Sequence, residues 1–171
     1  FNLDLNKVEL LLKKYGSKIK MIIPVHLAGN PVNITELRKI SSLYGCFLLE
    51  DSAHGLESVH NNKKTGDTED AAAFSFYANK NITTGGEGGA LATNNTELAE
   101  KVRKLSLHGM NKDGWNRFKT GNKWRYDVSE LGYKYNMTDV AASFGYWQMK
   151  QVDEWYTKRQ SIAKIYHDGF N

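Results

Sequence analysis

The sequence AAAFSFYANKNITTGGEGGALATN, residues 71–94, decides how we expect the chain to fold. It begins with a short apolar run that predicts a buried strand, and Ser75 and Lys80 stand near the end of this run. A cluster of glycines follows, and then a second short apolar strand at residues 90–92. Burial disfavours the charged form of an amine, so a lysine just beyond a buried strand can become a nucleophile. A single lysine is more often a solvated surface charge, and the choice depends on the surrounding motifs.

The residues before this stretch predict a strand, a helix and a second strand. Residues 20–26 and 46–49 are apolar runs typical of buried strands. Between them, Asn33 and Glu36 form a capping-box pattern that starts a helix, which we expect to end at a glycine. Strand, helix and strand in about thirty residues indicate a parallel βαβ unit. Ligands of such sheets bind beyond the carboxyl ends of the strands, where Asp51 is expected.

Further elements follow from the same patterns. An amphipathic helix is expected at residues 4–15, a loop with a short hairpin at residues 55–70, and a helix at residues 96–107. A long helix at residues 138–166 would carry one apolar side, formed by Val140, Phe144, Trp147, Val152 and Trp155. Residues 110–135 show no clear periodicity, which in a compact domain is typical of a functional loop or an interface.

The composition is that of an ordinary globular protein and excludes several classes. The 171 residues carry a net charge of +4 with scattered basic residues, and no apolar run is long enough for a membrane span. Cys46 is the only cysteine, the histidines are dispersed without metal-ligand spacing, and no signal sequence is visible, so we expect a cytoplasmic protein without a metal. Aromatic and basic residues mix between residues 115 and 135, which leaves a nucleic-acid surface as an alternative, although no known nucleic-acid module accompanies them.

Four motifs, in this order, resemble the DegT/StrS-type sugar aminotransferases, which are pyridoxal-phosphate (PLP) enzymes of fold type I. They are EDSAH (50–54), FSFYANK (74–80), GGEGGAL (85–91) and LGYKYNMTD (131–139). The resemblance implies an α/β fold, with the three-layer, mostly parallel sheet of the large PLP-binding domain. Family members are roughly twice as long. We therefore expect residues 1–171 to be the central part of this domain, ending in the long helix and lacking the N-terminal phosphate-binding segment and the C-terminal small domain.

The resemblance also implies a role for each of five residues. Lys80 matches the lysine that forms a Schiff base with the cofactor aldehyde, and Asp51 matches the carboxylate that keeps the pyridine nitrogen protonated. Ser75 matches a hydroxyl that binds the cofactor phosphate, and His54 falls near the cofactor ring. Asn136 matches an asparagine that reaches the phosphate of the neighbouring subunit's cofactor, which implies a homodimer with shared active sites.

Most of these residues also have an ordinary structural alternative. Asp51 could cap a turn, and Ser75 could bond to the backbone of its own strand. His54 could be a packed or solvated histidine. Asn136 could cap the following helix, because Asp139 stands three residues later.

The activity implied by the resemblance is transfer of an amino group from glutamate to the keto sugar of a nucleotide sugar. The sequence of residues 124–139 is most similar to those of members that aminate C4 of a UDP- or dTDP-linked sugar. Lys80 argues against the dehydrating branch of the family, in which histidine replaces the lysine. The alternative is a catalytically incompetent PLP-fold fragment that only binds a partner or self-associates. Neither a nucleic acid nor a membrane is an expected partner.

Overall fold

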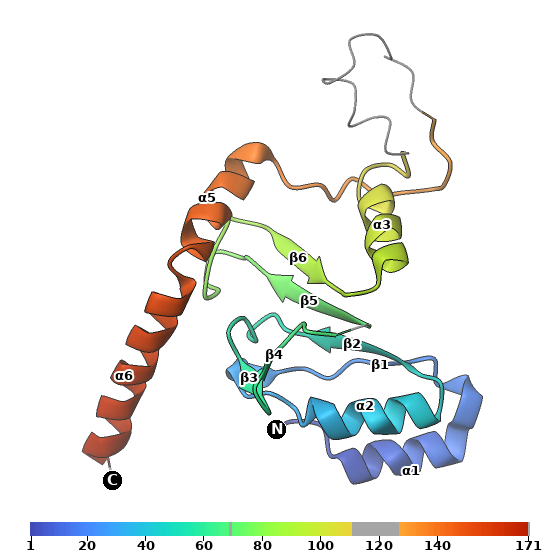
Figure 1. Ribbon diagram of the computed structural model, residues 1–171, viewed down its shortest axis with the longest axis horizontal. Coiled ribbons are helices and arrows are strands. Elements are labelled where there is room, and N and C mark those ends of the chain that lie inside the picture. The colour runs from blue at the N-terminus through green and yellow to red at the C-terminus, as the bar shows by residue number, and fades with distance from the viewer. Residues whose placement is uncertain (69, 111–126, 171) are drawn as a thin grey trace.

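The sheet is built around two parallel neighbours, β2 (Phe47–Asp51) and β5 (Ala71–Ser75). The short strand β1 (Met21–Ile22) lies parallel to β2, and β6 (Gly89–Ala92) lies antiparallel to β5, so the strand order is β1-β2-β5-β6 (Figure 1). This computed structural model describes residues 1–68, 70–110 and 127–170. The mixed α/β class and the mostly parallel sheet expected from the sequence are confirmed.

Strand β1 is shorter than the predicted strand at residues 20–26. Its regular pairing ends at Ile22, and Pro24, which has no N–H to donate, follows two residues later. The backbone nevertheless stays against β2, because the Asp51 N–H donates to the Pro24 carbonyl (2.8 Å) and the His26 N–H donates to the Asp51 carbonyl (3.0 Å). The predicted strand is therefore a short ladder followed by an extended segment.

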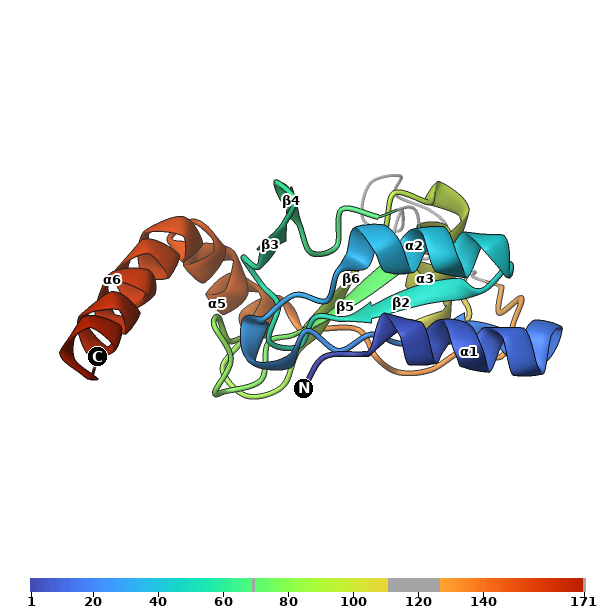
Figure 2. The ribbon, with the colours of Figure 1, turned by 90° about the horizontal axis from the view of Figure 1, so that it is seen from below.

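Two helices near the N-terminus begin at side-chain caps. Asp4 accepts hydrogen bonds from the backbone of the first turn of α1 (Leu5–Tyr15), and Asn33 accepts one from the Glu36 N–H at the start of α2 (Ile34–Leu43). Both helices contribute to the same apolar core beside β1 and β2 (Figure 2). The core consists of two clusters of buried residues: Leu12, Ile40 and Cys46, and Val32, Leu37 and Leu48.

The opposite face of the sheet carries exposed apolar side chains. Side chains alternate along a strand, and the register places Met21, Ile23, Val25 and Leu91 on the face away from Leu48. These four are 39–52% exposed. A helix layer on this face, as the three-layer expectation requires, is not supplied by the described residues.

Short elements connect the strands. The predicted hairpin within residues 55–70 is present as β3 (Val59–His60) and β4 (Lys63–Lys64). Two single-turn 3₁₀ helices, Gly16–Lys18 and Leu27–Gly29, follow α1 and precede α2. Helix α3 (Thr96–Leu105) starts at the predicted residue, with Asn95 as its cap, and ends two residues before the expected boundary.

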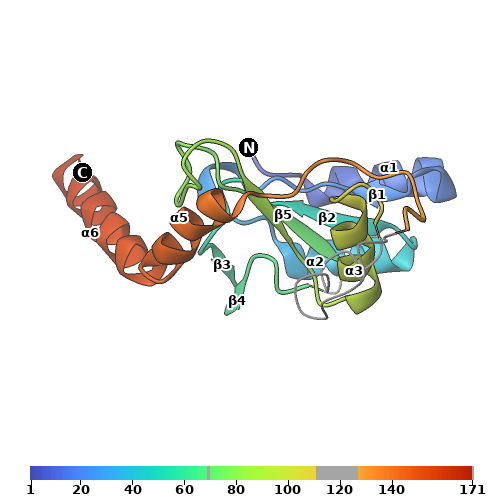
Figure 3. The same ribbon diagram turned by 90° about the horizontal axis from the view of Figure 1, so that it is seen from above.

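The single long helix predicted at residues 138–166 is wrong. The structure has two helices, α5 (Asp139–Met149) and α6 (Val152–Phe170), separated at residues 150–151. Figures 1 and 3 show the chain bending here, so that α6 extends away from the sheet. Val152, only 5% exposed, packs with Phe76 and Ile82, and we attribute the bend to this side chain turning into the body of the molecule. No described helix combines the length and the apolar content needed to cross a membrane.

Candidate functional site

The site lies at the carboxyl edge of the parallel strands, as the sequence predicted for Asp51. Asp51 is the last residue of β2, and its neighbours in the sheet are Val25 and Ala73. Ser75 ends β5 two residues beyond Ala73. Parallel strands present their carboxyl ends at one edge, so the fold brings the Asp51 carboxylate and the Ser75 hydroxyl to the same rim.

The half-buried carboxylate of Asp51 also starts a turn. Its Oδ1 accepts a hydrogen bond from the Ala53 N–H at 3.1 Å. The structural alternative considered for Asp51 is therefore present in part. This bond occupies one carboxylate oxygen and fixes the orientation of the group at the end of the strand.

Lys80 is held in a turn directly after β5. Its backbone N–H donates to the Tyr77 carbonyl at 3.0 Å, and the side chain is half-buried. The Ser75 hydroxyl accepts from the Tyr77 N–H at 3.3 Å. A single tight segment thus carries both Ser75 and Lys80, and Tyr77 connects them.

The glycines after Lys80 let the chain fold closely onto this turn. A Cβ on Gly88 would stand 2.1 Å from Thr84 Oγ1, and one on Gly89 would stand 2.7 Å from the Phe74 carbonyl oxygen. Gly85 has a φ of +90°, which favours glycine. At these three positions glycine allows a tight backbone turn behind the lysine.

His54 is exposed and is oriented by the backbone. Its Nδ1 accepts the Ala28 N–H at 3.3 Å, so a neutral ring carries its proton on Nε2. The ring lines an open cavity of about 550 Å³, together with Asn81 and Arg159.

 The cavity lies between the loop that follows β1 and helix α6, so His54 faces open space and not the core.

Asn136 is exposed just before α5, and none of the hydrogen bonds among the described residues joins it to the other four. The cap of α5 is Thr138, whose hydroxyl accepts the Ala141 N–H at 3.2 Å. The helix-cap alternative for Asn136 is therefore wrong. Its neighbour Met137 packs on the cluster beneath the lysine turn, whereas the Asn136 side chain is exposed.

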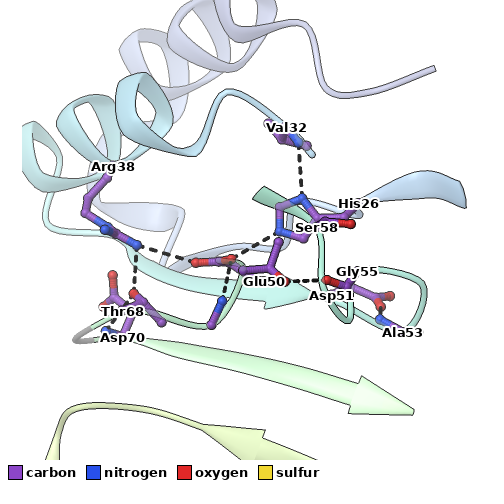
Figure 4. Close-up of polar contacts among 12 residues, drawn as sticks. His26, Val32, Arg38, Glu50, Asp51, Ala53, Gly55, Ser58, Thr68 and Asp70 are labelled. Carbon is purple, nitrogen blue, oxygen red and sulfur yellow. Dashed lines mark hydrogen bonds and ion pairs between the residues drawn. The ribbon is translucent and has the colours of Figure 1, made fainter. Parts of the chain in front are cut away.

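A buried polar network behind Asp51 was not predicted. His26 and Glu50 are at most 2% exposed, and His26 Nε2 lies 3.1 Å from Glu50 Oε2 (Figure 4). His26 Nδ1 accepts the Val32 N–H at 3.1 Å, so the neutral ring donates its Nε2 proton to the carboxylate. Arg38 reaches the other oxygen of Glu50 at 3.4 Å.

This network fixes the strand end that carries Asp51. Glu50 precedes Asp51 in β2, and His26 also donates its backbone N–H to the Asp51 carbonyl. The Arg38 guanidinium continues to Thr68 Oγ1 at 2.8 Å and so ties α2 to the loop before β5. The sequence does contain a signal for this network. Glu50 continues the alternation of the inward-facing residues Cys46 and Leu48, so an acidic side chain occupies a buried position and requires polar partners.

A metal ion and a nucleic acid are the other two ligands considered from the sequence. The described residues contain no group of three or more His, Cys, Asp or Glu side chains that could hold a metal ion. The aromatic and basic stretch at residues 115–135, considered as a nucleic-acid surface, lies mostly outside the described residues.

Sequence comparison relates the whole chain to proteins of known family. The sequence matches the DegT/DnrJ/EryC1/StrS aminotransferase family over residues 1–171. An uncharacterized protein of Methanocaldococcus jannaschii is 44% identical over 170 residues, which are 99% of this chain and 43% of the relative. The spore coat polysaccharide biosynthesis protein SpsC of Bacillus subtilis is 40% identical over 169 residues, which are 99% of this chain and 42% of that protein.

Structural comparison gives the same result. Spr1654 of Streptococcus pneumoniae, assigned as a sugar aminotransferase and solved in its PMP form, superposes with a TM-score of 0.84 at 30% identity. The match covers 99% of this chain and 46% of Spr1654, which has also been solved in a PLP form. The chain thus spans less than half the length of each of these relatives.

Proposed function

This chain belongs to the DegT/DnrJ/EryC1/StrS aminotransferase family, and we propose that it forms the central part of the cofactor-binding domain of a PLP-dependent sugar aminotransferase. The observation that carries the proposal is the placement of Asp51 and Ser75 at one rim of the sheet, with Lys80 in the turn that follows. The transferred group would come from glutamate, and the acceptor would be the keto sugar of a nucleotide sugar.

The chemistry of these three side chains fits PLP. The cofactor has an aldehyde that needs an amine, a pyridine nitrogen that needs a carboxylate, and a phosphate that needs hydrogen-bond donors. Lys80, Asp51 and Ser75 offer one group of each kind from adjacent elements. When bound, PLP supplies an electron sink for charge that develops on the substrate carbon.

Each residue has a defined task in this proposal. Lys80 Nζ holds the cofactor covalently at rest and then moves the proton to and from the reacting carbon of the substrate. Asp51 keeps the pyridine nitrogen protonated, and its bond to the Ala53 N–H keeps the carboxylate oriented. His54 would face the cofactor ring, and the Ala28 N–H restrains its Nδ1. Ser75 donates its hydroxyl proton to the phosphate.

The substrate assignment rests on the relatives. SpsC takes part in spore coat polysaccharide biosynthesis, and Spr1654 is assigned as a sugar aminotransferase. Within that class we propose a UDP- or dTDP-linked 4-keto sugar as the acceptor, because residues 124–139 are most similar to enzymes that aminate C4. A cytoplasmic location completes the proposal, and the free thiol of Cys46 is consistent with a reducing compartment.

Isotope transfer tests this function. The complete protein, loaded with PLP, is incubated with ¹⁵N-glutamate and a panel of UDP- and dTDP-linked 4-keto and 3-keto sugars, and the products are analysed by mass spectrometry. We expect ¹⁵N in a 4-amino sugar and none with the Lys80→Ala variant. Labelled product from Lys80→Ala, or none from the unmodified protein with any sugar of the panel, would contradict the proposal and favour a role in binding alone.

The proposed assembly is a homodimer in which Asn136 binds the phosphate of the neighbouring subunit's cofactor. Asn136 is exposed, and the adjacent helix α5 exposes Val140, Phe144 and Trp147, which a second subunit could cover. Mixing Lys80→Ala subunits with Asn136→Ala subunits should give one intact site per heterodimer and restore activity. Mixed dimers that stay inactive would argue against a shared site.

A further inference from the structure

Helices α5 and α6 contact the turn that carries Lys80 at three points. The connection between β5 and β6 runs against α5 and the start of α6 (Figures 1 and 3). We propose that Gly145 and Gln148 of α5 and Arg159 of α6 are positioning residues that hold the Lys80 turn in place. This inference rests on the proposed role of Lys80 and adds residues far from it in the sequence.

Gln148 binds the backbone of the turn with both ends of its amide. Its Oε1 accepts the Thr83 N–H at 2.9 Å, and its Nε2 donates to the Thr83 carbonyl at 2.8 Å. The pair has the pattern of two strands exchanging hydrogen bonds, made here by one side chain. Thr83 lies three residues after Lys80, so the bond fixes the backbone directly behind the lysine.

Gly145 lets α5 approach the turn. A Cβ at this position would stand 2.9 Å from the Thr84 methyl group. Glycine inside a helix costs about 0.5–1 kcal/mol relative to alanine, so its presence here requires a reason, and close approach supplies one. Thr84 is itself 4% exposed, and its hydroxyl donates to the Glu87 carbonyl at 2.9 Å.

Arg159 holds the residue next to Lys80. Its Nη2 donates to the Asn81 carbonyl at 2.8 Å, and the Asn81 amide donates in turn to the Leu56 carbonyl at 3.2 Å. Between the two hydrogen-bonded points, Ile82 is 1% exposed and packs on Val152 at the start of α6. Residues 81–84 are thus each fixed by a bond or a buried side chain, and Lys80 stands at the edge of this fixed segment.

A turn fixed in this way sets where the lysine amine stands. Displacing a reacting group by about 1 Å can cost about 100-fold in rate, even when the mutation lies away from the chemistry. Loosening α5 against the turn should therefore lower kcat and leave the KM for glutamate almost unchanged, because Gly145 and Gln148 do not contact the substrate in this proposal.

The first test uses steric relief in the complete, PLP-loaded protein. Gly145→Ala should lower kcat about 10-fold or more, and adding Thr84→Ser should restore most of it, because serine lacks the methyl group and keeps the hydroxyl. Gly169→Ala in α6 is the matched control, since a Cβ there meets nothing within 4 Å. If Gly145→Ala has the same kcat as Gly169→Ala, or if Thr84→Ser does not relieve the loss, the proposed role of Gly145 is wrong.

The second test measures the turn without the cofactor. Gln148→Met should speed hydrogen exchange of the Thr83 amide in the apoprotein about 10-fold or more, and Gln151→Met, a similar change at the exposed position after α5, should not. Arg159→Met should loosen the same segment, with Lys158→Met as the control for the lost charge. Exchange that is unchanged in both Gln148→Met and Arg159→Met would overturn the inference.

The activity of Lys80→Ala distinguishes the proposed function from the positioning role. If Lys80→Ala retains transamination, the proposed function fails and the positioning role fails with it. If Lys80→Ala is inactive while Gln148→Met matches Gln151→Met in kcat, in the KM for glutamate and in amide exchange, only the positioning role fails.

Discussion

The βαβ unit and the C-terminal helices bury their apolar side chains to very different extents. Helix α2 buries Leu37 and Ile40 against β2, whereas in the described structure α5 buries none of its residues and α6 buries only Val152. Yet α5 is rich in large apolar residues, and Phe144 and Trp147 are 54% and 61% exposed. An apolar helix face therefore shows that something must cover it, but not whether the cover comes from the same chain.

The polar contacts differ in the same way. The βαβ unit encloses the charged side chain of Glu50 together with its partners His26 and Arg38. The C-terminal helices place their polar contacts, those of Gln148 and Arg159, on the backbone of the lysine turn. The first region stabilises itself, whereas the second makes its polar contacts with the lysine turn.

The largest effect is expected inside the βαβ unit. Glu50→Ala leaves His26 and Arg38 without their common acceptor, and removing one partner of a buried ionic contact costs about 3–5 kcal/mol. Urea-induced unfolding followed by circular dichroism should show this loss. Glu36→Ala, which removes a half-exposed carboxylate on α2, is the control and should change stability by less than about 0.5 kcal/mol. Equal effects of the two substitutions would mean that the buried network does not stabilise the unit.

A smaller effect is expected from two matched substitutions of apolar residues, one in each region. Leu48→Ala removes a side chain that is 0% exposed and should cost about 2–5 kcal/mol of unfolding free energy. Phe144→Ala should cost about 1 kcal/mol or less in the monomer, because half of the ring is already in water. Sedimentation velocity should instead show weaker dimerisation for Phe144→Ala. A Phe144→Ala monomer destabilised as strongly as Leu48→Ala would break the comparison.

The smallest effect concerns Lys64 of β4, which links the hairpin after the βαβ unit to Asp153 of α6. Hydrogen bonding to Glu57, and attraction to Glu57 and Asp153, raise the pKa of Lys64 above its ordinary value of 10.5, although burial opposes the shift. Because the folded pKa is the higher one, the stabilisation is present below the unfolded pKa and is lost as pH rises through the folded pKa. Lys64→Met should cost less than about 1 kcal/mol at neutral pH and nothing above both pKa values. A cost that persists at strongly alkaline pH would exclude the ionic origin.

Much of the fold could be predicted because the patterns are local. The caps Asp4, Asn33 and Asn95 and the short apolar strands produce the expected elements with small boundary shifts. The break between α5 and α6 could not be predicted, since the apolar pattern continues across it and only the packing of Val152 on Phe76 and Ile82 accounts for the bend. The exposed face of the sheet likewise depends on which surfaces meet in space.

The candidate site, too, could be predicted from the sequence only in part. Motif and strand position identified Asp51, Ser75 and Lys80, and the register brings their elements to one rim. The contacts of Gln148 and Arg159 were missed, because each spans more than 60 residues of sequence and a polar residue on a helix carries no sign of a distant partner. The cap role considered for Asn136 failed because Thr138 stands closer to the helix and makes the bond.

Chemical trapping tests the central claim, that Lys80 carries the cofactor, most directly. The complete protein is loaded with PLP, reduced with borohydride, digested and mapped by tandem mass spectrometry. We predict a pyridoxyl group on Lys80, and none at this position when glutamate is added before the borohydride, because the amino donor displaces the lysine. A pyridoxyl group on another lysine in place of Lys80, or no adduct in a protein that still transfers ¹⁵N from glutamate, would contradict the account.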